Sequence, residues 1–221
     1  MKRLFDIAIS LFAIVITCPI LVPVIIAIWL EDLHSPFYFG NRVGKNNAQF
    51  KMIKLRSMVV NADKSGVDST SANDKRITNV GKFVRKFKLD EFPQFWNVLI
   101  GQMSIVGPRP NVKRETDLYT VVEKRILNIS PGITDIASIV FSDESEILAP
   151  YDDPDIAYNQ LIRPRKNELA LFYIDNSDFL FDIKIIFLTA ISIINKKLSL
   201  KLLIRSVRKL DNSKKIVDII R

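Results

Sequence analysis

The chain has 221 residues, 48% of them hydrophobic, and a formal net charge of +8. This length allows one sizeable domain or two small ones, and the apolar content excludes a globally disordered chain. A single cysteine, Cys18, excludes an internal disulfide, and a single histidine, His34, argues against a metal site built from His and Cys ligands. The excess positive charge predicts polyanionic partners, namely nucleic acid, phosphorylated substrates or an anionic membrane surface.

The first feature along the chain is an uncharged apolar run over residues 7–30, which is long enough to form a membrane helix. A cleaved signal peptide is disfavoured, because no small-residue cleavage site follows so long a run. Pro19 and Pro23 interrupt the run, and in a helix each would leave one backbone carbonyl without its partner. Thr17 could supply part of the compensation that such a break requires in lipid.

The charges on either side of this run predict its topology. Lys2 and Arg3 precede it and further basic residues follow it at 42–56, and both sets favour the cytoplasm. We therefore expect a re-entrant helix, broken at Cys18 and Pro19, that enters and leaves through one leaflet. A kinked helix that crosses the bilayer is the alternative.

Two strand-like runs, at 37–39 and 50–53, flank a Gly/Asn-rich segment and predict a β-hairpin. Lys54 and Arg56 follow on one side of an extended segment. They would contact a phosphate or belong to a solvated strand face, and the sequence supports both interpretations equally. Residues 61–79 are polar and predict a surface loop or lid.

A basic amphipathic helix is predicted at 80–87, where Arg85 is one of several cations between apolar residues at helical spacing. It leads into Asp90 and Glu91, at the start of a second predicted helix with Pro93 in its first turn. By themselves these carboxylates indicate a helix start complemented by the helix dipole. Beside a cation cluster they also form the environment in which a phosphate and a divalent cation meet. The apolar stripe predicted for this second helix is Leu89, Phe92, Trp96 and Leu99.

Beyond this helix, Pro108 and Pro110 hold Arg109 on a stiff, extended backbone. The planar guanidinium suits bidentate phosphate binding. A rigid loop with an exposed arginine is the simpler alternative, and it explains the prolines but not the arginine between them. A tight turn at 130–134 then precedes a predicted short strand at 136–141.

Three helical segments are expected in the C-terminal part, at 156–174, 179–194 and 196–208. The second is apolar, but its length of about 24 Å is short for a hydrocarbon core of ~30 Å, so we expect it to pack on the domain or lie at the interface. The third alternates aliphatic and basic residues, as helices on anionic headgroups do. The last dozen residues are expected to be loosely ordered.

Several short motifs follow one another along the chain: Lys-Arg-Leu-Phe-Asp at 2–6, Cys-Pro at 18–19, Arg-Val-Gly-Lys at 42–45, Lys-Leu-Arg-Ser-Met at 54–58, Leu-Asp-Glu-Phe-Pro-Gln at 89–94, Val-Gly-Pro-Arg-Pro at 106–110 and Pro-Gly-Ile-Thr at 131–134. Each is weak alone, but the series is specific. In their order and spacing the sequence resembles the bacterial sugar transferase family, the small monotopic polyprenyl-phosphate phosphoglycosyl transferases.

The resemblance implies transfer of a sugar-1-phosphate from a UDP-sugar to polyprenyl (undecaprenyl) phosphate, with release of UMP. Asp90 would be the nucleophile that forms a covalent phosphosugar intermediate. Mg²⁺ would bridge Asp90, Glu91 and the diphosphate, and the resemblance leaves open whether Glu91 holds the metal or takes a proton.

The resemblance also implies further site residues. Arg85 and Arg109 match family arginines near the phosphates, Pro108 and Pro110 flank the second of these, and Lys54 and Arg56 lie in the matching basic motif. In the family, a Ser-Pro pair breaks the membrane helix. Here Cys18 and Pro19 stand in its place, so one compensating hydroxyl is lost.

These observations together predict an α+β, predominantly helical fold with an N-terminal re-entrant membrane helix, a small β-hairpin and several amphipathic interfacial helices. We expect the re-entrant helix at 1–30, a cytoplasmic catalytic domain at 31–195 and a basic amphipathic tail at 196–221. The implied location is the cytoplasmic face of the bacterial inner membrane, where the protein would start assembly of a lipopolysaccharide, capsule or glycoprotein glycan. Membrane lipids are expected partners and nucleic acid is not; whether the protein forms a homodimer is left open.

One departure from the family pattern bears on the substrate. After Pro-Gly-Ile-Thr many members continue with Gly-Leu-Ala-Gln, whereas residues 135–138 here read Asp-Ile-Ala-Ser. This segment would border the sugar or nucleotide pocket, so the identity of the sugar is not carried over. A membrane-tethered protein that binds nucleic acid or anionic lipid without catalysis is the alternative function, but it gives no reason for carboxylates among the cations.

Overall fold

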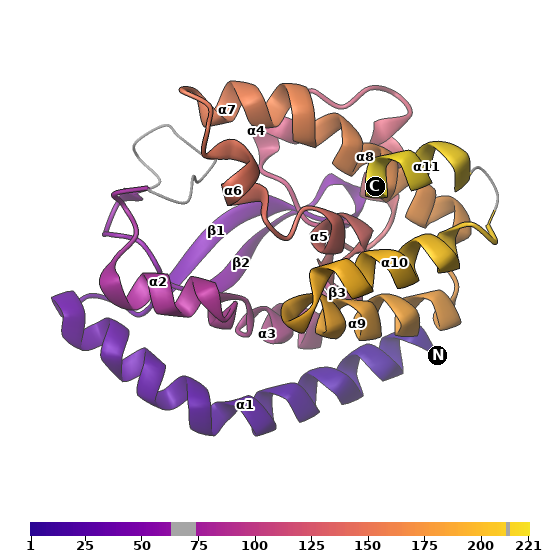
Figure 1. Cartoon of the computed structure of the whole chain (residues 1–221). Helices are drawn as coiled ribbons and strands as arrows, with labels where there is room; N and C mark the ends of the chain where they lie inside the picture. Colours follow the sequence, from indigo (N-terminus) through magenta and orange to yellow (C-terminus); the bar gives the residue numbers. More distant parts are fainter. Residues whose placement is uncertain (63–73, 211–212) are drawn as a thin grey trace.

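The computed structural model describes residues 1–62, 74–210 and 213–221, and Figure 1 shows their arrangement. Helices dominate, and a small antiparallel hairpin lies among them, which confirms the predicted predominantly helical α+β class. The loop predicted at 61–79 lies largely outside the described residues.

The predicted β-hairpin is confirmed. Strand β1 (Phe37–Val43) pairs antiparallel with β2 (Gln49–Leu55), with Phe37 opposite Leu55 and Val43 opposite Gln49. A second, parallel pair joins β3 (Ser104–Val106) to β4 (Gly132–Thr134). A Cβ atom on Gly132 would lie 2.2 Å from the backbone nitrogen of Gly107, so glycine at this position permits the two segments to approach closely.

The N-terminal apolar run forms one long helix, α1 (Lys2–Asp32), drawn in indigo as a single bowed helix beneath the rest of the molecule (Figure 1). It is the one helix in the described residues that is long and apolar enough to cross a membrane. Pro19 and Pro23 lie inside it, so the predicted break at Cys18 and Pro19 is not an interruption of the helix. The Thr17 hydroxyl donates to the carbonyl of Ala13, at 2.7 Å, and such bonds bend helices without breaking them.

The first turn of α1 is bound to the folded body by charged groups. Lys2 pairs with Asp182 and donates from Nζ to the carbonyl of Val106 at 3.0 Å. Arg3 donates to the carbonyl of Leu99 at 2.7 Å. These contacts place the start of the apolar helix against residues that lie about one hundred and more positions later in the chain.

The last turn of α1 is bound to the same body. The Arg56 guanidinium, just after β2, donates two hydrogen bonds of 2.6 Å to the carboxylate of Asp32. Glu31 accepts a bond of 2.9 Å from the backbone nitrogen of Asn79, the first residue of α2 (Asn79–Lys86). The two ends of the apolar helix therefore contact one folded domain.

The apolar stripes predicted for the middle helices are wrong in part. In α2, Val84 is buried while Phe83 is exposed, and Phe87, which follows the helix directly, is exposed as well. In α3 (Gln94–Leu99), Trp96 is exposed and Asn97 is buried. Asn97 faces a strand edge and bonds the backbone of β2, accepting from Ile53 at 2.9 Å and donating to Lys51 at 2.8 Å. A helix that packs on a strand edge satisfies that edge with polar atoms, which hydrophobic spacing does not reveal.

The main core lies among the C-terminal helices. Around it are α8 (Arg163–Asn176), α9 (Phe179–Ile194), α10 (Lys196–Val207) and α11 (Ser213–Ile220). The range of α9 matches its prediction. The expected loose ordering of the last dozen residues is wrong, because α11 places three buried aliphatic side chains in the core: Ile216, Val217 and Ile220.

The strand predicted at 136–141 is wrong, because these residues form helix α5 (Ile136–Val140). The carboxylate of Asp135 accepts from the backbone nitrogen and the hydroxyl of Ser138, each at 2.6 Å, and so caps the helix. Short helices α6 (Glu144–Leu148) and α7 (Pro154–Ala157) follow, then a π-helical turn (Tyr158–Ile162) that leads into α8. Helix α4 (Lys113–Thr116) and a 3₁₀ segment (Glu123–Asn128) precede β4.

Candidate active site

Asp90 and Glu91 lie in a 3₁₀ turn (Leu89–Glu91) between α2 and α3. Lys88 enters this turn in the left-handed region, with φ 53°, so the chain turns sharply where the basic helix ends. Helix α3 begins only at Gln94, with Pro93 as its N-cap residue and no side-chain cap. The carboxylates are therefore not the cap of α3, and their side chains are available for other contacts.

The two carboxylates lie among cations from three separate segments. The Lys54 ammonium, from β2, is 3.8 Å from Asp90 Oδ2 and 3.5 Å from Glu91 Oε1. Arg109 grips the Glu91 carboxylate with both terminal nitrogens, one of them at 3.2 Å. The positive charge of Arg85, in α2, also acts on Asp90. The structure thus brings together five residues that the sequence analysis selected.

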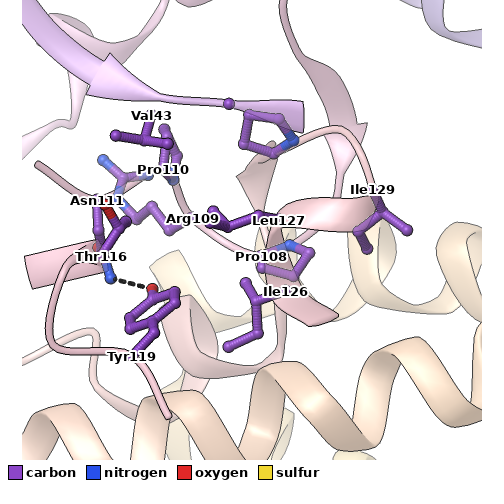
Figure 2. Close-up of a pocket in the computed structure, with 12 residues that line it drawn as sticks. Val43, Pro108, Arg109, Pro110, Asn111, Thr116, Tyr119, Ile126, Leu127 and Ile129 are labelled. Carbon is purple, nitrogen blue, oxygen red and sulfur yellow. Dashed lines mark hydrogen bonds between the residues drawn. The ribbon is translucent and has the colours of Figure 1, made fainter. Parts of the chain in front are cut away.

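Arg109 is held rigidly from both sides of the Pro-Arg-Pro segment. Its guanidinium donates to the carbonyl of Ile133 at 2.9 Å, and its backbone nitrogen donates to Asp135 at 3.2 Å. Figure 2 shows the segment from Pro108 to Asn111 beside Tyr119, whose hydroxyl accepts from the Asn111 amide at 2.8 Å. The small pocket drawn there has a volume of about 10 Å³, so little empty space is left behind the arginine.

The same surroundings give the two carboxylates different proton affinities. Burial raises the pKa of Asp90, and the charges of Lys54 and Arg85 offset this only in part. For Glu91, burial is outweighed by Arg109 and Lys54, which lower its pKa to about 2. Burial lowers the pKa of Lys54, against the opposing effect of the two carboxylates. Glu91 is thus an ionised partner of Arg109, and its low pKa makes it a poor proton acceptor at neutral pH.

These groups line one large cavity of about 980 Å³, which lies between the hairpin, the Pro-Arg-Pro segment and helices α5, α6 and α8. Such a volume suits a ligand of nucleotide-sugar size. All of the predicted site residues outside the membrane helix line it: Lys54, Arg56, Arg85, Asp90, Glu91, Pro108, Arg109 and Pro110.

Three of the predicted site residues do not have the contacts that the sequence analysis expected. Arg56 borders the cavity, but Asp32 occupies both of its terminal nitrogens, so in this structure it binds α1 to the hairpin. Cys18 and Pro19 lie within α1, and neither lines the cavity.

Asp135 is a site residue whose role the sequence reasoning missed. It connects Arg109 to α5 and lines the cavity. The signal was present, because aspartate is one of the residues preferred at a helix N-cap. Because a strand was predicted at 136–141, no helix was expected there for Asp135 to cap.

The described residues contain no group of three or more His, Cys, Asp and Glu side chains that could hold a metal. Mg²⁺ commonly uses only one or two carboxylates and completes its coordination with substrate phosphates and water. The site fits this mode through Asp90, since Arg109 already engages both oxygens of Glu91.

Comparison with known proteins assigns the chain to a family. The model of the bacterial sugar transferase family matches residues 1–196. A UDP-N-acetylgalactosamine-undecaprenyl-phosphate N-acetylgalactosaminephosphotransferase of Aeromonas hydrophila is 34% identical over 85% of this chain and 42% of its own length. A UDP-glucose:undecaprenyl-phosphate glucose-1-phosphate transferase of Klebsiella pneumoniae is 35% identical over 85% of this chain and 39% of its own length.

A shorter relative matches over most of its own length. The uncharacterised sugar transferase EpsL of Bacillus subtilis strain 168 is 33% identical over 86% of this chain and 85% of its own length. The chain spans about two fifths of the length of the Aeromonas and Klebsiella relatives, so what they share with it is the sugar transferase region. The family match covers the hairpin, the dyad turn, the Pro-Arg-Pro segment and α5–α9. The chain belongs to the bacterial sugar transferase family.

Proposed function

We propose that this protein is a phosphoglycosyl transferase, which moves a sugar-1-phosphate from a UDP-sugar to polyprenyl phosphate and releases UMP. The observation that carries the proposal is a buried aspartate, Asp90, beside the Lys54 ammonium and the Glu91–Arg109 pair on the wall of a large cavity. The Aeromonas and Klebsiella relatives are named as transferases of a phosphosugar group from UDP-N-acetylgalactosamine and UDP-glucose, respectively, that act with undecaprenyl phosphate.

The proposed reaction has two displacements at one phosphorus. A carboxylate oxygen of Asp90 attacks the β-phosphorus, the bond to the bridging oxygen breaks, and UMP leaves with that oxygen. An oxygen of polyprenyl phosphate then attacks the same phosphorus and displaces Asp90, which yields the polyprenyl diphosphate sugar and free enzyme. Two such steps give ping-pong kinetics.

The cations permit an anionic nucleophile to approach an anionic substrate. Lys54 of β2 and Arg85 of α2 both act on Asp90, and their charge offsets the repulsion between carboxylate and diphosphate. A Mg²⁺ ion held by Asp90 and the diphosphate oxygens would further neutralise charge on the leaving group. Glu91 keeps the Arg109 guanidinium at the edge of the cavity, a positioning role that its low pKa supports over proton transfer.

We further propose that α1 is embedded in the cytoplasmic leaflet of the inner membrane and is re-entrant. Both of its ends contact one folded domain, through Lys2 and Asp182 at the start and through Asp32 and Arg56 at the end. A helix that crossed the bilayer would place these ends on opposite sides. A row of its apolar side chains is exposed and suits contact with lipid: Leu11, Phe12, Val15, Ile16 and Ile20.

Asp90→Asn tests the proposed reaction in purified full-length protein with undecaprenyl phosphate and a panel of UDP-sugars. We expect UMP release to fall by at least roughly a thousandfold, because the amide is not a nucleophile. Asp117→Asn removes an exposed carboxylate that pairs with Lys113 on α4, and it should leave the rate unchanged. A binding protein without catalysis would release no UMP in any variant, and UMP release by Asp90→Asn at the wild-type rate would exclude Asp90 as the nucleophile.

A further inference from the structure

The large cavity continues past the catalytic dyad along a polar wall made by α5, α6 and α8. On this wall lie Ser138, Ser142, Glu144, Ser145, Lys166 and Asn167. Figure 1 places α6 and α8 on the side of the hairpin away from α1, so this part of the cavity lies far from the helix that we assign to the membrane. The lining contributed by the hairpin and the segment after it mixes cations such as Arg42 and Lys54 with apolar side chains such as Phe39 and Met58. The polar wall, which lies away from α1, therefore suits the water-soluble substrate rather than the lipid.

This wall is joined to the dyad by consecutive contacts. Glu91 binds the side chain of Arg109, the backbone of Arg109 binds Asp135, and Asp135 binds both the backbone and the hydroxyl of Ser138. In a nucleotide sugar the sugar ring is attached directly to the β-phosphate. The ring must therefore lie next to any residue that attacks that phosphorus. The polar wall is an adjoining surface whose hydrogen-bonding groups carry no net charge, which suits an uncharged ring, whereas the hairpin side of the cavity is rich in cations.

An ion pair lies on this wall. Glu144, at the start of α6, pairs with Lys166 of α8, and the Lys166 ammonium lies 5.1 Å from the centre of the Tyr158 ring. Both charged side chains are partly exposed, 30% for Glu144 and 24% for Lys166. The pair therefore offers a carboxylate acceptor and an ammonium donor to the cavity at fixed positions.

We propose that this wall binds the sugar ring of the donor, and that Glu144 and Lys166 determine which sugar is accepted by hydrogen bonding to its ring substituents. The inference rests on the proposed transferase function and extends it to sugar selection. Hydroxyl and acetamido groups are the features that distinguish common UDP-sugars. A site built to hydrogen-bond a substituent discriminates strongly against a donor in which that substituent is absent or inverted.

The test uses full-length protein, undecaprenyl phosphate and four donors: UDP-glucose, UDP-galactose, UDP-N-acetylglucosamine and UDP-N-acetylgalactosamine. UMP release gives kcat/KM for each donor, and inhibition by UMP reports the nucleotide part alone. In Lys166→Met and in Glu144→Gln we expect the ratio of kcat/KM between the best and second-best donors to change about tenfold or more, the effect of one lost charge-assisted hydrogen bond. Inhibition by UMP should remain within about twofold of wild type.

Two controls separate recognition from support of the fold. Asp143→Asn removes the adjacent carboxylate, whose partner Lys196 on α10 lies 2.5 Å away, and neither residue lines the cavity. This variant should keep the wild-type donor ratios. A double variant that exchanges the charges, Glu144→Lys with Lys166→Glu, retains an ion pair between α6 and α8 but inverts the groups offered to the sugar, so its donor ratios should still change.

The inference is overturned if donor ratios are unchanged in the single variants, or if the charge exchange restores the wild-type ratios, which would indicate a purely structural pair. Weaker inhibition by UMP at constant donor ratios would assign the wall to uridine instead and also overturn it. Failure of the underlying function would be seen separately, as a wild-type protein that releases no UMP from any donor.

Discussion

At the scale of single residues, two adjacent carboxylates have different proton affinities because their neighbours differ. Glu91 is engaged by both terminal nitrogens of Arg109, which lowers its pKa to about 2. Asp90 is more deeply buried and has no such clamp, and burial raises its pKa. The unclamped carboxylate of Asp90 is the one to which the proposed function assigns the attack on phosphorus.

Arg109→Lys tests whether the geometry of the clamp matters as well as its charge. A lysine keeps the positive charge but cannot bind both Glu91 oxygens and the Ile133 carbonyl together. Losing one or two charge-assisted hydrogen bonds predicts a fall in kcat/KM of roughly 10- to 100-fold, measured by UMP release. Exposed Arg125, which pairs with Asp175 away from the cavity, provides the matched control as Arg125→Lys. Equal activity of the two variants would contradict the clamp.

The Glu91 pKa predicts how stability depends on pH. The carboxyl has an ordinary value of 4.5 and a folded value of about 2, so folding favours its ionised form. Its contribution, on the order of 3 kcal/mol, is fully present above pH 4.5 and is lost as the pH falls toward 2. The free energy of unfolding of wild type relative to Glu91→Gln, from urea titrations in detergent without divalent cations, should decrease over this range. If the difference in the free energy of unfolding between wild type and Glu91→Gln does not vary with pH, the low pKa assigned to Glu91 is wrong. Glu146→Gln, at an exposed position on α6, is the control and should show no such dependence on pH.

At the scale of elements, Arg56 belongs to the basic motif after β2 but binds the Asp32 carboxylate at the end of α1. The residue borders the cavity, but its two hydrogen bonds of 2.6 Å join the end of α1 to the end of β2. Phosphate binding, as expected from the basic motif, would require these bonds to be given up. The structure therefore favours a role in fixing α1 to the hairpin.

A double-mutant cycle distinguishes these roles. If Arg56 acts through Asp32, then Arg56→Gln, Asp32→Asn and the double variant should each lose roughly 1–2 kcal/mol of stability, with no additional loss in the double variant. Their kcat/KM values should also fall to the same extent. A much larger loss of activity in Arg56→Gln than in Asp32→Asn would instead support direct contact with a phosphate.

At the scale of the whole molecule, the attachment of both ends of α1 to one body supports the re-entrant topology that we propose. Lys2 and Asp6 contact the region of β3, and Asp32 contacts the segment after β2. The bowed shape in Figure 1 comes from a continuous helix, whose backbone hydrogen bonding is interrupted only where Pro19 and Pro23 lack an N–H donor. In the proposed topology, the carbonyls freed there are the unpaired groups that would lie in the bilayer.

Cysteine labelling in intact cells measures this topology. In a Cys18→Ser background, one cysteine is added before Met1 and another replaces Lys45 in the exposed turn of the hairpin. A membrane-impermeant maleimide should label neither in intact spheroplasts and both after lysis. Labelling of the N-terminal cysteine alone in intact spheroplasts would establish a helix that crosses the bilayer.

The sequence alone determined the features that depend on local patterns. The uncharged run from Ile7 to Leu30, the hairpin and the bounds of α9 follow from composition and periodicity over short windows. The grouping of Asp90 and Glu91 with basic residues was visible as well, because Arg85 and Lys88 precede them directly in the chain.

Only the tertiary structure decided which cation binds which carboxylate. Arg109 clamps Glu91 and Arg56 clamps Asp32 because segments 18 and 24 residues apart meet in space, and sequence spacing does not specify such partners. Likewise α5 forms instead of a strand because Asp135 caps it, and Asn97 is buried because a strand edge needs its amide. Buried polar groups must find partners wherever the fold places them, and those partners define the site.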